Sequence, residues 1–252
     1  MPEDRRPLLA VLIDADNTSP QYTKAIFDEI ASLGEASVRR CYGDFASPQM
    51  RGWSKVTAEF GLVPHHQPAN TIGKNASDIA LVIDAMDLLH SGRFDGFVLV
   101  SSDSDFTRLA SRIREQGLDV YGIGQRKTPE AFVRACKRFI YLENIDAGPA
   151  REAKRGRGRE TAPDTAAPDL APETEPRSLN EARDLILKAM DSIDQDDEWY
   201  ALGPLGQFVV AANPDFDTRS YGKKKFSDLV QAIRIFETKR GPSNQLLVRR
   251  LD

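Results

Sequence analysis

The chain has 252 residues, of which 40% are hydrophobic and 29% charged, and its formal net charge is −4. This length suits one large domain or two modest ones, and the composition is that of a globular protein rather than of a fibre or a disordered chain. The longest apolar runs, such as 79–83 and 97–100, fall far short of the roughly 20 residues that cross a bilayer. Residues 1–7 do not resemble a secretion signal, so the sequence predicts a cytoplasmic protein with no membrane partner.

The first 146 residues alternate apolar, strand-like runs with helical patterns. Apolar strands without two-residue alternation, separated by helices, are typical of a parallel sheet covered on both faces. We therefore expect a doubly wound α/β domain. The expected strands are 8–13, 36–42, 62–66, 97–101, 118–123 and 139–143, and the expected helices are 21–33, 49–60, 78–90, 106–116 and 129–137.

The composition changes sharply over residues 147–177. These 31 residues hold five prolines, seven alanines and three glycines, with Leu170 as the only large apolar side chain. Such a stretch cannot offset its ordering entropy by burial, so it is predicted to be a flexible linker. Its first part, 151–159, has five cations in nine residues and is either a solvated tether or a basic arm for phosphates. The linker separates domains 1–146 and 178–252.

The last 75 residues predict a small helical domain with a wing. A helix is expected over 179–190, with Ser178 as its N-cap and Glu181 three residues later. A short second helix is expected within 199–210, a third within 215–233, and a two-stranded wing within 235–250. Charge is uneven here, because 181–217 carries 2 basic and 9 acidic groups whereas 219–251 carries 9 basic and 2 acidic groups. Locally clustered positive charge allows a nucleic-acid partner despite the net charge.

Acidic residues follow the expected strands at the edge where doubly wound sheets bind ligands. Asp14 and Asp16 follow the first strand, Asp103 and Asp105 follow the fourth, and Asp78 opens a helix. Carboxylates gathered at one edge repel one another, and a divalent cation removes that repulsion. The alternative for each acid is helix capping, which we expect for Asp105 more than for Asp103.

Two other residue types refine the expected site. Ser77 is the better cap for the helix that Asp78 opens, which leaves Asp78 free to point at the site. Asp84 lies about 9 Å further along that helix and is expected to be structural. Only two cysteines and three histidines occur, at spacings unlike those of zinc sites, so Cys41 and Cys136 are expected to be reduced. Any metal must then be held by oxygen atoms, as suits Mg²⁺ or Mn²⁺.

Three other known motifs involve some of these residues, and the sequence can be compared with each of them. Residues 14–18 match the nucleophile motif of haloacid-dehalogenase phosphatases. The chain order disagrees with that family, because the acidic pair at 103 and 105 precedes a candidate lysine such as Lys127. No Walker loop surrounds Lys74, and an EF-hand beginning at Asp103 has arginine at the positions of its turn glycine and closing glutamate.

Three segments in order, 11–17, 74–85 and 98–110, resemble the NYN domain, the PIN-like nuclease family that includes the LabA-like proteins. The resemblance covers residues 7–146 and implies a PIN-like, Rossmannoid fold with metal-dependent ribonuclease activity. It implies that Asp14, Asp78 and Asp103 bind Mg²⁺ or Mn²⁺, that Asp105 assists them, and that Asn17 orients substrate or water. Membership alone does not establish catalysis.

Residues 178–252 resemble the OST-HTH or LOTUS domain, a winged helix-turn-helix, most specifically over 221–230. The resemblance implies RNA as the partner, although some such domains bind proteins instead. The cations that would contact phosphates are Lys223, Lys224, Lys225, Arg234, Lys239, Arg240, Arg249 and Arg250.

The sequence thus predicts a metal-dependent ribonuclease tethered to an RNA-binding domain. Two alternatives stay open at this point. One is a non-catalytic RNA-binding or adaptor protein on a nuclease fold, and the other is a phosphatase of the haloacid-dehalogenase type.

Overall fold

The computed structural model describes most of both predicted domains. The described residues are 5–67, 76–145, 176–193, 195, 197–242 and 244–251. The predicted linker lies outside the described residues up to position 175, as do Lys74 and Asn75. Among the described helices, none is both long and apolar enough to cross a bilayer.

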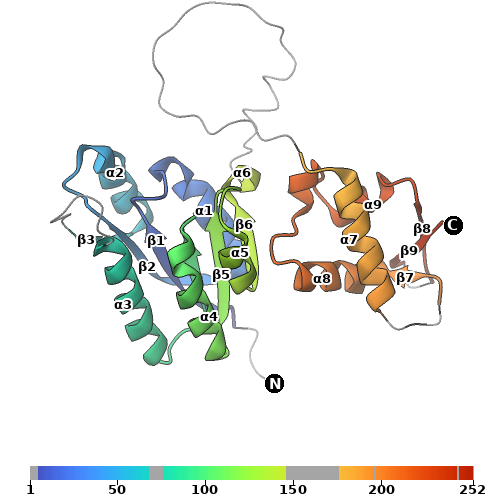
Figure 1. The fold of residues 1–252 in the computed structure, drawn as a ribbon, viewed down its shortest axis with the longest axis horizontal. Helices are drawn as coiled ribbons and strands as arrows, with labels where there is room; N and C mark the ends of the chain where they lie inside the picture. Colours follow the sequence, from blue (N-terminus) through green and yellow to red (C-terminus); the bar gives the residue numbers. More distant parts are fainter. Residues whose placement is uncertain are drawn as a thin grey trace, which may run out of the picture. The chain divides into compact units, whose positions relative to one another are not determined.

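The chain falls into two compact units. One holds Met1–Asp146 with Asn213–Asp215, and the other holds Ala147–Ala212 with Phe216–Asp252. Figure 1 colours the described residues up to 145 from blue to yellow-green and those from 176 onward from orange to red.

Six strands of the first unit form one parallel sheet in the order β3-β2-β1-β4-β5-β6. Strands β1 and β4 are rich in apolar residues and are buried along all or nearly all of their length, as expected in a sheet that helices cover on both faces. The strands are β1 (Leu8–Asp14), β2 (Glu35–Gly43), β3 (Val63–His66), β4 (Gly96–Val100), β5 (Asp119–Gly124) and β6 (Arg138–Tyr141). The order reverses between β1 and β4, which places the switch point of the sheet there.

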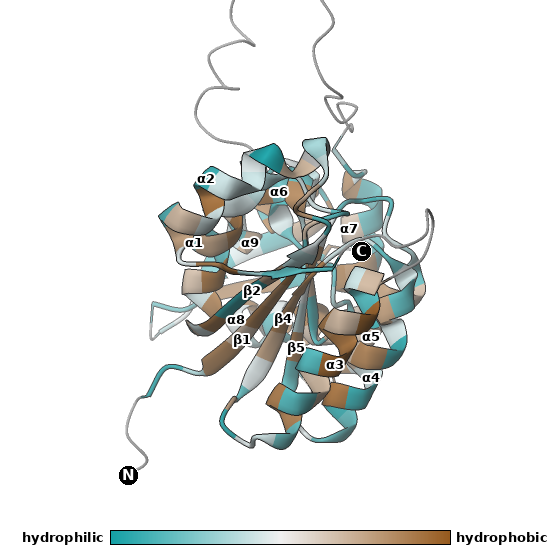
Figure 2. Cartoon of the chain, turned by 90° about the vertical axis from the view of Figure 1, so that its left-hand side faces the viewer, coloured by the Kyte–Doolittle hydropathy of each residue, from teal (hydrophilic) through white to brown (hydrophobic). Residues whose placement is uncertain are grey.

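Helices cover both faces of this sheet, so the predicted doubly wound α/β fold is confirmed. Leu81 and Ile113 belong to the apolar cluster on one face, whereas Ile26 and Trp53 belong to the cluster on the other. Figure 2 shows the apolar strands between a layer with α1 and α2 and a layer with α3, α4 and α5. The helices are α1 (Thr23–Leu33), α2 (Arg51–Phe60), α3 (Ala76–His90), α4 (Thr107–Glu115), α5 (Glu130–Ala135) and α6 (Leu142–Ile145).

Several element ends differ from the sequence prediction. Short 3-10 turns, η1 (Pro20–Tyr22), η2 (Pro48–Met50) and η3 (Ser104–Phe106), precede α1, α2 and α4. Proline supplies a favourable first residue for such turns, which are common at helix starts. The last expected strand ends at Tyr141, because the chain then turns into α6.

The two cysteines are free and buried, and they lie in different apolar clusters. Cys41 packs on the face with α1 and α2, and Cys136 packs on the opposite face. This placement agrees with the expectation that both cysteines are reduced, which stays a prediction.

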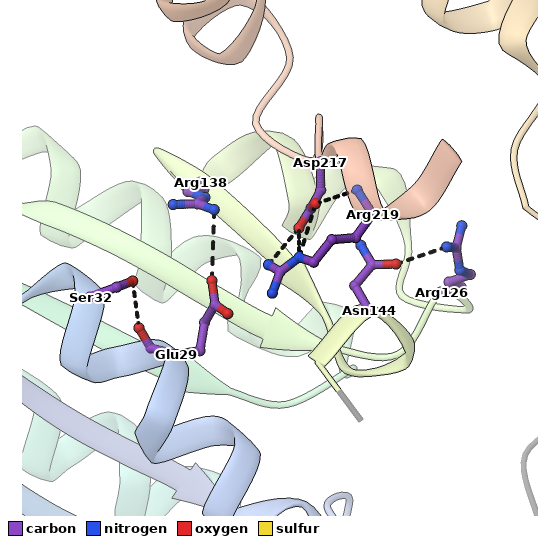
Figure 3. A network of polar contacts seen from close by, with 7 residues as sticks. All are labelled: Glu29, Ser32, Arg126, Arg138, Asn144, Asp217 and Arg219. Atoms are coloured by element: carbon purple, nitrogen blue, oxygen red, sulfur yellow. Dashed lines mark hydrogen bonds and ion pairs between the residues drawn. The ribbon is translucent and has the colours of Figure 1, made fainter. Parts of the chain in front are cut away.

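Polar contacts fix the outer strand β6 and the segment after β5. Arg138 Nη2 lies 3.7 Å from Glu29 Oε1 on α1, and Ser32 Oγ donates to the Glu29 carbonyl (Figure 3). Arg126 Nη2 donates to Asn144 Oδ1 on α6 at 3.0 Å (Figure 3). These contacts attach the sheet margin to the helices beside it.

The second unit is helical with a small antiparallel sheet in the order β7-β9-β8. Ile186, Leu205 and Leu229, one from each α-helix, lie in its fully buried core. The elements are α7 (Leu179–Ser192), β7 (Tyr200–Ala201), α8 (Leu202–Ala212), η5 (Thr218–Tyr221), α9 (Phe226–Gln231), β8 (Phe236–Arg240) and β9 (Leu246–Arg250). The predicted winged helix-turn-helix is confirmed, with β7 as a strand that the sequence analysis missed.

Side chains cap the ends of two elements in this unit. Ser178 is the N-cap of α7, as predicted, and accepts from the Asn180 N–H at 3.2 Å. Glu181 lies 3.5 Å from Arg177. Asp217 caps η5 and binds the Arg219 guanidinium at 2.6 Å (Figure 3).

Candidate functional site

The predicted acidic residues gather at the carboxyl edge of the sheet, around its switch point. Asp14 is the last residue of β1, and Asp103 follows the end of the neighbouring strand β4. Asp78 lies in the first turn of α3. The first turn of a helix and the ends of two adjacent strands therefore supply the carboxylates.

Asp14 is buried, with 3% of its surface exposed, and it accepts two hydrogen bonds. Ser101 Oγ donates to Oδ2 at 2.7 Å, and the Asn17 backbone N–H donates to Oδ1 at 3.1 Å. Burial, helped by the charges of Asp78 and Asp16, raises the pKa of Asp14 to about 7, although the hydrogen bonds from Ser101 and Asn17 lower it. In the folded protein this carboxyl group therefore gains or loses its proton near neutral pH.

Asp78 experiences the same repulsion from other acids. Its pKa is raised, first by burial and then by the charges of Asp103, Asp16 and Asp105. Three acidic segments that are far apart in the sequence thus act on one another through space. The expected gathering of these carboxylates is what the structure displays.

Asp103 has a local role that the sequence analysis assigned to Asp105. Asp103 is the N-cap of η3 and accepts from the Asp105 N–H at 2.9 Å. An N-cap residue is extended and accepts from the N–H two or three residues ahead, and Asp103 has that position whereas Asp105 is inside the turn. The capping interpretation of Asp105 is therefore wrong.

The start of α3 also corrects a prediction. The helix begins at Ala76, so Ser77 is inside its first turn and is not an N-cap of the helix. Alanine has the highest helix propensity, which favours this extension. Asp78 is half-buried among the other acids, as expected.

The structure adds two residues to the site, because the sequence analysis did not consider Ser101 and gave Asp16, which it placed among the acids, no role there. Ser101 donates to Asp14 and accepts from the Asp103 N–H at 3.0 Å, so one hydroxyl joins two of the acids. Asp16 is exposed, accepts from the Asp44 N–H at 3.3 Å and acts on both Asp14 and Asp78. Its position two residues after Asp14 was the available signal.

Carboxylate oxygens of this kind suit Mg²⁺ or Mn²⁺, and a cation would remove the repulsion that raises two of the pKa values. The donor chemistry therefore fits a divalent ion. Within the described residues, however, no three His, Cys, Asp or Glu side chains are close enough together to hold one. The carboxylates lie within electrostatic range of one another without forming a closed set of ligands.

The predicted RNA-contacting cations lie on three parts of the second unit. Lys223, Lys224 and Lys225 precede α9, and Arg234 follows it. The other cations, on the wing strands β8 and β9, are Lys239, Arg240, Arg249 and Arg250.

Part of this charge is engaged within the wing. Arg249 lies 2.7 Å from Glu237 and 3.5 Å from Glu198. Lys239 Nζ and Arg249 Cζ lie 3.7 Å and 4.8 Å from the centroid of the Trp199 ring. Trp199 thus organises two of the predicted cations by cation–π contact.

Comparison with solved structures finds several similar chains, two of which are described here. A protein of unknown function from Vibrio parahaemolyticus is 20% identical, with 55% of this chain and 94% of that chain covered, at a TM-score of 0.47. The catalytic domain 2 of an Ostrinia furnacalis group II chitinase is 11% identical, with 99% and 84% covered, at a TM-score of 0.25. Among curated proteins, none matches this chain.

Family comparison identifies both parts of the chain. The NYN domain matches residues 8–143, which is more than half of the chain, and the OST-HTH/LOTUS domain matches residues 177–248. The match to NYN spans the whole parallel sheet and every acidic residue of the site, and the second match spans the winged helix-turn-helix. The chain therefore belongs to the NYN family of PIN-like domains and carries an OST-HTH/LOTUS domain after it.

Proposed function

We propose that this protein is a metal-dependent ribonuclease whose C-terminal domain holds RNA near the nuclease site. The observation that carries the proposal is that burial, together with charge repulsion among the acids, raises the pKa values of Asp14 and Asp78 at the switch point of an NYN domain. Buried, like-charged carboxylates are costly, and they are typical of sites where a cation or a proton is part of the function. We propose residues 1–146 as the nuclease domain, 147–177 as the tether and 178–252 as the RNA-binding domain.

Asp14, Asp78, Asp103 and Asp105 are the proposed metal ligands. A bound Mg²⁺ or Mn²⁺ would supply Lewis acidity and would neutralise the charge that builds on a phosphodiester. A bound cation would offset the charge repulsion among these acids, so we expect its binding to draw their carboxylates together.

Three neighbours have proposed supporting roles. The Asn17 side chain is exposed beside Asp14 and would orient the substrate or the attacking water. Ser101 holds Asp14 Oδ2 and the Asp103 backbone, so it would keep these two ligands at a fixed spacing. Asp16 would contribute negative charge that strengthens cation binding.

The cations of the second unit would bind RNA phosphates without sequence preference. A tether between the two domains raises the effective concentration of bound RNA at the nuclease site. The plot of log affinity against log salt has a negative slope that steepens with each phosphate contact. Replacing Lys223, Lys224 and Lys225 with alanine should therefore make this slope shallower by roughly 2. The exposed Lys188 on α7 gives the matched control, since Lys188→Ala should leave that slope unchanged.

The main test compares wild-type protein with Asp103→Asn on labelled single-stranded and structured RNA. Each protein is incubated with Mn²⁺, with Mg²⁺ and with chelator. Cleavage by the wild type that chelator and Asp103→Asn both abolish supports the nuclease. The control is Asp87→Asn, an exposed acid on α3, which should cleave like the wild type.

The second candidate is an RNA-binding adaptor built on a nuclease fold, which the OST-HTH/LOTUS match at residues 177–248 supports without requiring cleavage. It predicts RNA binding without cleavage under every condition of the same experiment. A phosphatase would instead hydrolyse a small phosphomonoester, which a ribonuclease leaves intact.

A further inference from the structure

Three residues on neighbouring strands form a row that leads away from the acidic site. In the register of the sheet, Asp14 of β1 pairs with Tyr42 of β2, and Tyr42 pairs with His65 of β3. Paired residues of adjacent parallel strands point to the same face, and Tyr42 belongs to the cluster on the α3 face. His65 therefore lies on the same face as Asp14, two strand spacings or about 10 Å from it.

Asp84 of α3 fixes the side chains at the far end of this row. Its Oδ2 lies 2.8 Å from Arg40 Nη1, 2.9 Å from the Tyr42 hydroxyl and 3.2 Å from His65 Nδ1. The Tyr42 and His65 rings also contact each other, with centroids 5.0 Å apart. Burial and the neighbouring Asp84 raise the pKa of Tyr42, so its hydroxyl stays a donor. The His65 ring is therefore held from two sides.

This arrangement determines which nitrogen of His65 is available. Of the two ring nitrogens, Nδ1 faces the Asp84 carboxylate, which can only accept, so the contact requires the proton on Nδ1. A neutral imidazole donates from one nitrogen and accepts at the other. With Nδ1–H directed at Asp84, Nε2 carries the lone pair. Among the residues that the structure describes, Nε2 has no partner, and the His65 side chain is 30% exposed.

The other two histidines are placed differently. His66 Nδ1 is 3.8 Å from Asp44, beyond hydrogen-bond distance, and its side chain is 46% exposed. His90 ends α3, at the opposite end of the helix from Asp78, and its Nδ1 lies 2.7 Å from the Met86 carbonyl. His65 alone among the three combines a carboxylate on Nδ1 with a strand position in register with Asp14.

We propose that His65 Nε2 accepts a hydrogen bond from a ribose 2′-hydroxyl of RNA bound at the acidic site, and thereby favours RNA over DNA. The inference rests on the proposed RNA site at this edge of the sheet. A lone pair cannot contact a phosphate oxygen, which is itself only an acceptor, but it suits a hydroxyl donor. The 2′-hydroxyl is the group by which proteins distinguish RNA from DNA. About 10 Å from Asp14, His65 meets the sugar of a nucleotide near the scissile bond rather than the bond itself.

Asp84 is a positioning residue in this proposal, because it sets which nitrogen of His65 bears the proton. Asp84→Asn should weaken the discrimination between RNA and DNA less than replacement of His65 does, because the contact between the His65 and Tyr42 rings is retained. In a chain with only three histidines, imidazole nitrogen resonances can be assigned one by one. The expected spectrum shows His65 protonated on Nδ1 in the wild type, and this preference should be lost in Asp84→Asn.

The test uses the full chain and a set of RNA oligonucleotides in which one ribose at a time is replaced by 2′-deoxyribose. One replacement should lower kcat/KM of the wild type by between about threefold and tenfold, as loss of a single hydrogen bond does. His65→Phe, which keeps the ring against Tyr42, should be insensitive to that replacement. His65→Gln retains an acceptor and should recover part of the effect, and His90→Phe is the matched control that should behave like the wild type.

Binding to the same oligonucleotides in chelator separates this inference from the proposed function. If the wild type never cleaves but its affinity falls for one deoxy position only when His65 is present, the ribonuclease is wrong and the His65 contact stands. If the wild type cleaves every deoxy-substituted RNA equally well, or His65→Phe keeps the same sensitivity, the His65 contact is wrong and the ribonuclease stands.

Discussion

Asp78 and Asp84 are two aspartates on the same helix, six residues apart, with opposite surroundings. Asp78 faces the negative charges of Asp103, Asp16 and Asp105, which help raise its pKa. Asp84 faces donors from three residues, all on one carboxylate oxygen. The two residues share a residue type and a helix, and the groups that face each carboxylate decide whether it has a cationic partner.

The strongest test of this contrast is Asp78→Asn. We expect RNA cleavage to fall about a thousandfold, because the loss of a proposed metal ligand would remove several kcal/mol of charge stabilisation in the transition state. Stability of the metal-free protein should be unchanged or higher, since repulsion from Asp103 and Asp16 is relieved. Initial rates with Mn²⁺ and thermal melting in chelator measure the two effects. Activity within tenfold of the wild type would remove Asp78 from the site.

The next effect is the pH dependence of stability that Asp14 causes. Its pKa rises from 3.8 in the unfolded chain to about 7 in the folded protein, so the folded state binds the extra proton between these values. Metal-free wild type should therefore lose stability as pH rises from about 4 to about 7, by on the order of 4 kcal/mol relative to Asp14→Asn.

Urea unfolding of both proteins at several pH values measures this difference. Added Mn²⁺ should cancel the loss in the wild type and have little effect on Asp14→Asn. If the free energy of unfolding of the two proteins changed in parallel with pH, the pKa of Asp14 would be the same in the folded and unfolded states, which would contradict the prediction.

On the other side of the comparison, Asp84→Ala should destabilise the fold by about 2 kcal/mol. The change leaves the Arg40 guanidinium, whose side chain is 28% exposed, without its carboxylate. A fully buried pair would cost more, and partial exposure to water reduces the loss. Asp87→Ala, on the exposed side of the same helix, should stay within about 0.5 kcal/mol of the wild type. Equal losses in the two variants would contradict a structural role for Asp84.

The smallest expected effect comes from Tyr42→Phe. It removes one of the three donors to Asp84 while Arg40 and His65 remain, so we expect a loss of about 1 kcal/mol. Chemical denaturation gives this value directly. A loss as large as that of Asp84→Ala would mean that the tyrosine hydroxyl, rather than Arg40, balances the carboxylate.

Most of the fold could be predicted because its signals are local. The apolar runs of β1 and β4 can be buried only inside a parallel sheet, and the helical periods between the strands place helices on its faces. Positions of Asp14 and Asp103 at strand ends follow from those runs. That the two residues lie near each other then follows because doubly wound sheets form their ligand site at the carboxyl ends of the strands beside the switch point.

The features that could not be predicted depend on geometry between distant segments. Ser101 joins Asp14 to the Asp103 backbone, and nothing in its local sequence distinguishes it from the adjacent Ser102. The pairing of His65 with Asp84 depends on the register of β3 and on the path of α3 across it. Asp103 rather than Asp105 is the N-cap because a 3-10 turn precedes α4, and so short a turn has no hydrophobic periodicity by which the sequence could have predicted it.

The two thiols on opposite faces of the sheet make this chain convenient for site-specific chemistry. The sheet separates Cys41 from Cys136, so they cannot form a disulfide with each other without unfolding. Burial raises the pKa of each thiol to about 12, so neither forms the reactive thiolate at neutral pH. A maleimide dye would then react only with a cysteine introduced between the two domains, so the two native cysteines need not be replaced.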